Sequence, residues 1–110
     1  MAEKLALKQA IRGARLFYLR IKKELPVKAI FLYGSYAQGE PDVESDIDIG
    51  VVLDSSETKD VFSVGLRLWQ EAHAVDTRIE PFCILSDDYD SCEPASILAE
   101  IKRTAIPINE

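Results

Sequence analysis

The sequence is poor in the residues that build disulfide scaffolds and zinc sites. It holds two cysteines, Cys83 and Cys92, and a single histidine, His73, in 110 residues. Two cysteines are too few for a disulfide framework, and their spacing with one histidine does not fit a zinc site. We therefore expect both cysteines to be reduced thiols, as is usual in the cytoplasm.

Long hydrophobic runs are missing as well. No stretch of the sequence approaches the roughly 20 apolar residues that a membrane-spanning helix requires. Residues 1–4 (Met-Ala-Glu-Lys) lack the apolar core of a secretory signal. From these absences we expect a cytoplasmic protein that makes no contact with a membrane.

Positive charge is scarce outside the beginning of the chain. Residues 1–28 contain eight of the thirteen basic residues and two acids, so this segment carries +6 and the remainder −12, for a net charge of −6. Nucleic-acid binding depends on neutralising phosphates, so we do not expect a chain with this balance to bind nucleic acid directly. The acidic remainder is instead suited to recruiting cations.

The length predicts one domain, spanning 1–110, around one hydrophobic core. A chain this short buries only about two-thirds of its unfolded surface, so oligomer formation or a protein partner would add stability. The sequence patterns predict helices at 4–24, 59–74 and 96–104, a short helix at 36–38, and strands at 27–33, 46–53 and 77–85. This alternation is typical of the α/β class, and we expect a mixed sheet of three to four strands flanked by helices.

Two of these elements carry further expectations. Pro81 lies inside the third predicted strand and cannot donate a ladder hydrogen bond, so we expect that strand to be at an edge of the sheet or to be irregular at this residue. In the middle long helix, the packing face centred on Leu68 is predicted to be widened by Phe62 and Trp69. His73 lies near the end of this helix, where we expect a surface or capping role.

The most informative residues for chemistry are Asp46 and Asp48, at the start of the second predicted strand. Side chains two apart on a strand share a face and lie about 6–7 Å from each other. Two such carboxylates repel each other unless a cation lies between them. A pair of Mg²⁺ ions about 3.5–4 Å apart would account for both acids. The simpler alternative is a pair of solvated acids at an exposed strand start.

A second feature, Gly34-Ser35, ends the first predicted strand. Glycine permits a tight turn and a close approach to a ligand, and the N–H groups and hydroxyl at a helix start can hold an anion. An ordinary helix cap is the simpler interpretation. No Gly-Lys-Ser/Thr follows, so this is not a P-loop, and the single histidine, His73, is poorly placed to make Ser35 a hydrolase nucleophile.

The two features together are more specific than either alone, because an anion cradle beside a cation site is what a nucleoside triphosphate with Mg²⁺ requires. The stretch resembles the minimal nucleotidyltransferase family of the DNA polymerase β-like superfamily. Length and element order are also similar to the family across nearly the whole chain. The residues that carry the resemblance are Gly34-Ser35, Ala37, Gly39-Glu40 and Ser45-Asp46-Ile47-Asp48.

This resemblance implies the polymerase β-like nucleotidyltransferase fold and transfer of AMP from ATP to a hydroxyl. It implies that Asp46, Asp48 and a third carboxylate from a neighbouring strand bind two Mg²⁺ ions, and that Gly34 and Ser35 hold the β- and γ-phosphates.

Two residues compete for the place of the third carboxylate. Glu80 and Asp76 share strand parity but lie about 13 Å apart on an extended strand, so only one can join the cluster. We favour Glu80 because it lies in the middle of the strand. The chain departs from the family pattern in having glutamate where aspartate is commoner. It also has Gln38 where arginine is frequent, so one phosphate contact of the family is missing.

The resemblance also extends to a partner. Family members of this size resemble the antitoxins of toxin–antitoxin pairs, in which AMP is attached to a tyrosine of a helical HEPN-type ribonuclease. This implies an antitoxin role and a HEPN-type partner. Two alternatives remain open, a module that inactivates a partner by covering it and a regulatory subunit that binds ATP without transferring it.

Overall fold

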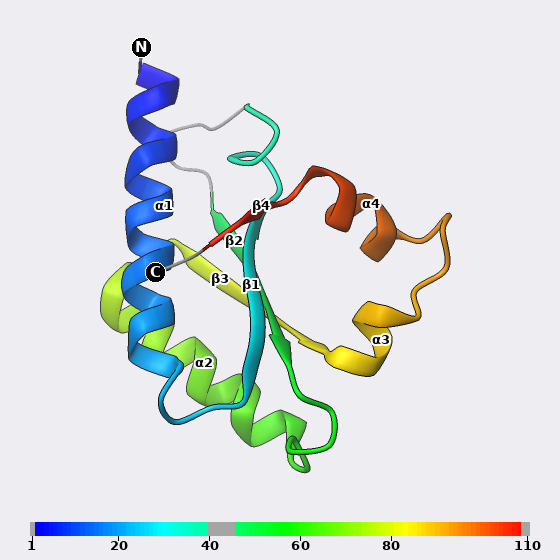
Figure 1. Ribbon diagram of the computed structural model, residues 1–110. Coiled ribbons are helices and arrows are strands. Elements are labelled where there is room, and N and C mark those ends of the chain that lie inside the picture. Colours follow the sequence, from blue (N-terminus) through cyan, green and yellow to red (C-terminus); the bar gives the residue numbers. More distant parts are fainter. Residues whose placement is uncertain (1, 40–45, 109–110) are drawn as a thin grey trace.

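The computed structural model describes residues 2–39 and 46–108, with side chains from residue 6 onward (Figure 1). Within these ranges the elements are α1 (Ala2–Ile21), β1 (Val27–Tyr33), β2 (Ile47–Leu53), α2 (Val61–Val75), β3 (Ile79–Leu85), α3 (Ser86–Asp90), α4 (Ile97–Thr104) and β4 (Ile106–Pro107). The long helices and strands match the predicted ones to within a few residues. The short elements α3 and β4 were not predicted.

The strands form one mixed sheet in the order β3-β2-β1-β4. β2 runs antiparallel to β1 and parallel to β3, and β4 pairs antiparallel with β1. The predicted α/β class with a mixed sheet is therefore confirmed. β3 lies at the edge, which is one of the two arrangements expected from Pro81, because a proline has no N–H to donate to a second neighbour.

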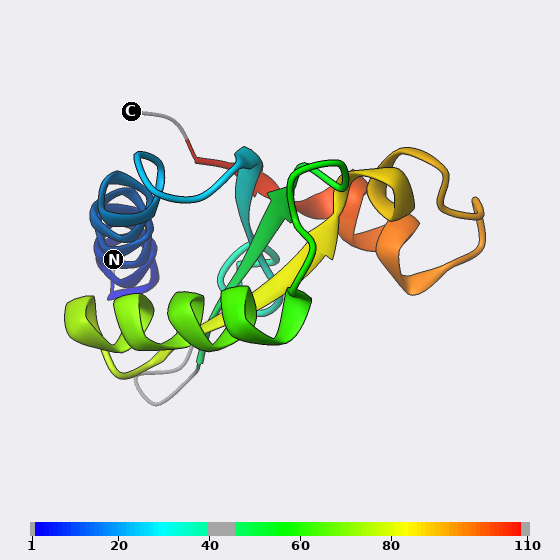
Figure 2. The same ribbon diagram turned by 90° about the horizontal axis from the view of Figure 1, so that it is seen from below.

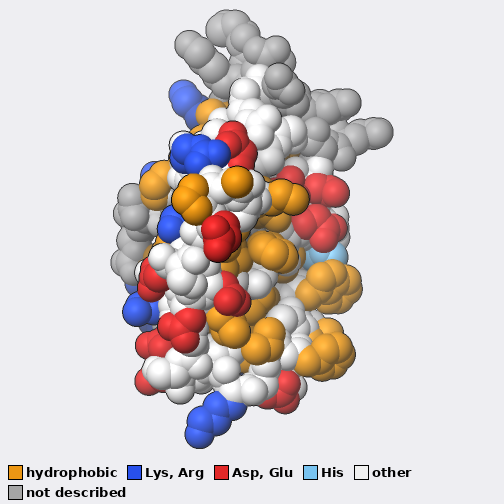
Figure 3. Space-filling view, turned by 90° about the vertical axis from the view of Figure 1, so that its right-hand side faces the viewer, with side chains coloured by type: hydrophobic (Ala, Val, Ile, Leu, Met, Phe, Trp, Pro, Cys, Tyr) orange, Lys and Arg blue, Asp and Glu red, His pale blue; other side chains and the backbone are white. Residues whose placement is uncertain are grey.

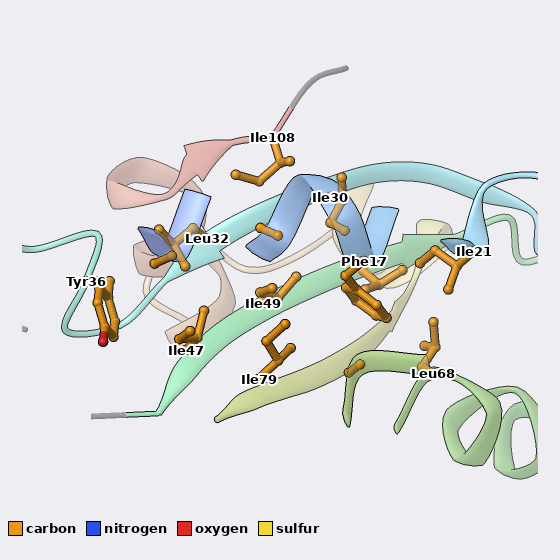
Figure 4. Close-up of a cluster of buried hydrophobic side chains, with 14 of the residues drawn as sticks. Phe17, Ile21, Ile30, Leu32, Tyr36, Ile47, Ile49, Leu68, Ile79 and Ile108 are labelled. Carbon is orange, nitrogen blue, oxygen red and sulfur yellow. The ribbon is translucent and has the colours of Figure 1, made fainter. Parts of the chain in front are cut away.

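Helices α1 and α2 cover one face of the sheet, and α3 and α4 lie on the other (Figures 1 and 2). Alternate strand residues pack against α1 and α2 in the main core, which Figure 4 shows in close-up. The fully buried strand residues of this core are Leu32, Ile47, Ile49, Val51, Leu53 and Ile79. The opposite face carries a smaller core around Phe31, Val52 and Ile84.

Polar interactions define the start of α2 and link it to the N-terminal segment. The Asp60 side chain accepts a hydrogen bond from the Ser63 backbone N–H and caps the start of α2. Arg20 of α1 donates to Glu71 of α2 at 2.8 Å, and Arg67 of α2 contacts Glu24, which follows α1. These ion pairs are exposed and contribute little energy, so the apolar contacts beneath them hold the helices together.

Two local predictions need correction, the one for Phe62 and Trp69 and the one for residues 36–38. Phe62 and Trp69 do not widen the packing face of α2, because their side chains are 82% and 49% exposed. His73 contacts the Trp69 ring at 4.1 Å between centroids, and its Nε2 is buried without a hydrogen-bond partner among the described residues. The predicted helix at 36–38 is instead a hydrogen-bonded turn. Within the described residues, no helix is both long enough and apolar enough to cross a membrane.

Candidate active site

A row of polar side chains crosses three strands on the face opposite α1 and α2. Tyr33 at the end of β1 pairs with Asp48 on β2, and Asp48 pairs with Glu80 on β3. Neighbouring strands lie about 5 Å apart, so the two carboxylates start from adjacent points of the same surface. The register therefore brings together two acids that are separated by 32 positions in the sequence.

Asp46 lies just before β2, in an exposed position at the same end of the sheet. The backbone there is held by the N–H of Ile47, which donates to the carbonyl of Arg78 at 2.8 Å. The pKa of Asp48 is raised above its ordinary value, first by burial and then by the negative charges of Asp46 and Glu80. The charges of Asp46 and Glu80 therefore both act on the central acid, Asp48.

Tyr33 belongs to the same row of side chains. Burial raises the pKa of its phenol, and the charges of Asp48 and Glu80 raise it further. The hydroxyl is therefore neutral at physiological pH and remains available as a hydrogen-bond donor. Sequence reasoning missed this residue, although its place directly before the Gly34 turn was a usable signal.

The turn after β1 lies directly against the carboxylate of Asp48. Gly34 has a φ of 76°, and a Cβ at this position would collide with Asp48 Oδ2. Glycine is needed here for two reasons, the left-handed backbone and the absence of a side chain. The backbone that the sequence identified as an anion cradle is thereby placed beside the central acid.

The turn itself is short and is anchored in the main core. The Gln38 N–H donates to the Gly34 carbonyl at 3.1 Å, which closes a single helical turn. Tyr36 is only 2% exposed, and its ring is turned into the apolar cluster (Figure 4). Ser35 lies in this turn, between the glycine and the buried tyrosine. The sequence pattern does not predict Tyr36 as the anchor, since tyrosine is intermediate between the buried and the exposed residue types.

Asp76 occupies a different position from Glu80. It caps the end of α2, and its carboxylate accepts hydrogen bonds from the backbone and guanidinium of Arg78. These bonds hold the pKa of Asp76 below its ordinary value. Glu80 instead projects from the strand beside Asp48 and is exposed. The Asp76 carboxylate is thus engaged by Arg78, whereas the Glu80 carboxylate belongs to the row.

The acids of this row provide the hard oxygen ligands that Mg²⁺ prefers. Their mutual effect on the pKa of Asp48 is the repulsion that a divalent cation would relieve. No three histidine, cysteine, aspartate or glutamate side chains among the described residues already converge on one metal position. Asp46 and Glu80 are exposed, next to the half-buried Asp48. The residue types, hard oxygen ligands, fit the cation.

Other residues noted in the sequence are not among those that the structure places in the row. Glu40 and Ser45, which belong to the family signature, fall outside the described residues. The basic residues of α1 belong to a helix that covers the opposite face of the sheet (Figure 2). The row of acids on this face is therefore built from β1, β2 and β3 with the Gly34 turn.

Comparison with known proteins agrees with this architecture. A family model described as the nucleotidyltransferase domain matches residues 15–91, which include the whole row and the turn. A solved structure from Sulfolobus solfataricus, of a protein assigned as a candidate nucleotidyltransferase, is similar over 97% of this chain and 86% of its own. Its TM-score is 0.68 at 16% identity, so the likeness concerns the fold. No curated protein matches at a significant level.

Proposed function

The chain belongs to the nucleotidyltransferase domain family, and from this premise we propose that it is a Mg²⁺-dependent enzyme that transfers AMP from ATP to a hydroxyl group. The observation that carries the proposal is the register that sets Glu80 beside Asp48, with the Gly34 turn against the same carboxylate. Acids for a cation and backbone for an anion then share one surface.

Each residue has a role in this proposal. Asp46, Asp48 and Glu80 hold two Mg²⁺ ions through their carboxylate oxygens. The backbone of Gly34 and the hydroxyl of Ser35 hold the β- and γ-phosphates. Asp76 is not a ligand, since its carboxylate is engaged by Arg78.

The reaction joins an acceptor oxygen to the α-phosphorus. The hydroxyl loses its proton to a carboxylate of the row, the bond between the α-phosphorus and its bridging oxygen breaks, and pyrophosphate leaves. Mg²⁺, when bound, supplies positive charge to the reacting phosphate and makes the attacking oxygen easier to deprotonate. The chain contributes mainly alignment and fixed charge, as in other phosphoryl transfers.

We further propose that the acceptor is a tyrosine of a HEPN-type helical partner, and that the chain acts as its antitoxin. The support is the resemblance of the Gly34–Asp48 signature to minimal nucleotidyltransferases. The net charge of −6 is compatible with a partner whose RNA-cleaving surface is basic.

Labelled ATP tests the enzyme. The chain is incubated with Mg²⁺, ATP labelled at the α-phosphate and the product of the adjacent gene, and the label on protein is measured. We expect labelled partner with the wild type and none with Asp48→Asn. Glu80→Gln and Asp76→Asn form a matched pair, because both neutralise one acid of the same segment. Transfer is lost with the first and retained with the second.

Other outcomes identify the rival functions. If Mg-ATP does not bind in isothermal titration while the partner is still inactivated, the chain is a covering module. If ATP binds and no acceptor is ever labelled, it is a regulatory nucleotide sensor. Loss of transfer in Asp76→Asn with retention in Glu80→Gln would show that the assignment of the third carboxylate is wrong.

A further inference from the structure

An apolar groove of about 680 Å³ lies on the same face of the sheet as the carboxylate row. Its lining comes from the end of β1, the first residue of α2, the edge strand β3 and the helices α3 and α4. The lining residues on which the argument depends are Tyr33, Phe82, Ile84, Asp88, Leu98 and Ile101. Figure 3 shows hydrophobic side chains gathered on the side of the molecule that carries α3 and α4. A groove of this size is in the range of small-molecule sites.

The groove begins where the carboxylate row ends. Tyr33 belongs to both, because it pairs with Asp48 and also lines the groove. Phe82 follows Glu80 by two positions on β3, so it lies about 7 Å further along the same face. Ile84 follows by two more. The groove therefore extends along the strands, whereas the row of acids runs across them.

The two directions correspond to two parts of the reacting nucleotide. One is the line through the attacking oxygen, the phosphorus and the leaving oxygen, and the other is the direction in which the nucleoside lies. In phosphoryl transfer the leaving and attacking oxygens lie in line through the phosphorus. With pyrophosphate at the Gly34 turn on β1, the attacking hydroxyl approaches over β3, beside Glu80. The nucleoside lies to one side of this line, and the groove is an apolar surface that extends from the row to one side, along the strands. This step rests on the proposed function.

We propose that the groove is the nucleobase subsite and that it takes a base with an exocyclic amino group. The half-exposed ring of Phe82 offers a face on which a base stacks, and Leu98 and Ile101 of α4 provide the opposite apolar wall. Asp88 is the one charged side chain among the described residues that line it.

Asp88 supplies the selectivity. An ionised carboxylate only accepts hydrogen bonds. Adenine and cytosine present an amino group on the edge where uracil presents a carbonyl oxygen. Asp88 is therefore complementary to the first two and repels the third. Adenine also fills the groove better than cytosine, because it has the larger apolar ring system.

Isothermal titration with Mg-ATP and Mg-UTP tests the subsite, and circular dichroism verifies folding of each variant. We expect ATP to bind at least about tenfold more tightly than UTP, which corresponds to about 1.4 kcal/mol. Phe82→Ala weakens ATP binding about tenfold. Phe62→Ala is the matched control, because this ring is more exposed and lies outside the groove, and it leaves the affinity unchanged.

A second pair of variants isolates the selectivity. Asp88→Asn reduces the preference for ATP over UTP, because an amide both donates and accepts. Asp87→Asn removes the neighbouring charge, which does not line the groove, and keeps the preference.

The outcomes separate this inference from the proposed function. Equal affinity for ATP and UTP, together with wild-type binding in Phe82→Ala, overturns the base subsite. If Asp48→Asn abolishes binding in that case, the transferase proposal still stands. Loss of transfer in Phe82→Ala with unchanged ATP affinity assigns the groove to the acceptor and also overturns the inference. Absence of nucleotide binding in the wild type overturns both.

Discussion

The two faces of the sheet are made by alternate residues of the same strands, and they differ in polarity and in burial. On the face under α1 and α2, each inward position of β2 is apolar and fully buried. On the other face, the corresponding positions run from an acid at one end through glycine to valine at the other. The acid lies at the end that the helices leave uncovered.

This difference shows how a small fold can hold a destabilising site. The pKa of Asp48 is raised first by burial and then by the charges of Asp46 and Glu80, so both its burial and its neighbours disfavour the ionised form. Burial of large side chains on the closed face supplies free energy of folding, at about 25 cal/mol for each Å² of apolar surface. The closed face therefore stabilises the sheet, and the open face is available for binding.

Substitutions of two neighbouring residues of β2, Asp48 and Ile49, test the difference between the two faces most directly. Asp48→Asn should reduce transfer and Mg²⁺ binding by about a hundredfold or more, since even indirect partners of metal ligands affect affinity by 10- to 100-fold. The melting temperature without metal should not fall, because the substitution removes a repelled charge. Calorimetry with and without Mg²⁺ measures both effects. A variant that is less stable without metal would contradict the electrostatic account.

Substitution of the adjacent residue should lower stability and leave activity unchanged. Ile49→Ala removes a fully buried side chain from the closed face and should lower the free energy of unfolding by about 2–5 kcal/mol. Transfer activity per folded molecule should stay near that of the wild type. Denaturant titration gives the stability, and the labelled-ATP assay below the unfolding transition gives the activity. Loss of activity in the folded variant would mean that the two faces are strongly coupled.

The two turn glycines separate backbone strain from damage to the site. Gly34 and Gly39 have φ values of 76° and 77°, so alanine should strain each by about 1–2 kcal/mol. Only at Gly34 does the new Cβ collide with Asp48, whereas at Gly39 it meets no described atom. Gly34→Ala should therefore lose nucleotide binding, and Gly39→Ala should lose stability alone. Equal nucleotide affinities in the two variants would refute the contact.

A third glycine tests the packed end of the open face. A Cβ on Gly50 would collide with the Phe31 ring. This ring stacks on the Tyr89 ring, with 6.0 Å between the two centroids. Gly50→Ala should therefore lower the free energy of unfolding by about 1–3 kcal/mol. Gly65→Ala is the control, because α2 has open space there and alanine should stabilise the helix by up to about 1 kcal/mol. Thermal denaturation compares the two, and a stabilising Gly50→Ala would be the contrary result.

The smallest expected effect concerns Asp76, the acid that is not part of the row. Because Arg78 lowers the folded pKa of Asp76, the contribution of this pair to stability is complete above the ordinary pKa of 3.8. It disappears as the pH falls through the folded pKa. Asp76→Asn should cost about 0.5 kcal/mol at neutral pH, as expected for a surface pair, and should flatten the acid side of the stability profile. An unchanged profile would contradict the pairing.

Much of this fold could be predicted from local patterns. The long helix at the start, three strands and the helix between the second and third strand follow from hydrophobic periodicity, which reflects which side of an element is buried. The proline in β3 also marked the edge of the sheet correctly. The rings of Phe62 and Trp69 misled the prediction for α2, because periodicity cannot tell an exposed apolar side chain from a buried one.

For the site, the sequence determined which residue types are present and which share a strand face, because alternation is a property of the chain itself. Alternation predicts that Asp46 and Asp48 share a strand face, and the Gly34-Ser35 pair predicts the turn after β1. Only the tertiary structure decided that Glu80 lies beside Asp48, that Asp76 is held by Arg78, that Tyr33 joins the row and that Tyr36 anchors the turn. The contacts of Asp48 with Tyr33 and Glu80 depend on the register between strands, and burial of Tyr36 depends on the packing of the core; both are fixed by the packing of whole faces against helices, which no local pattern contains.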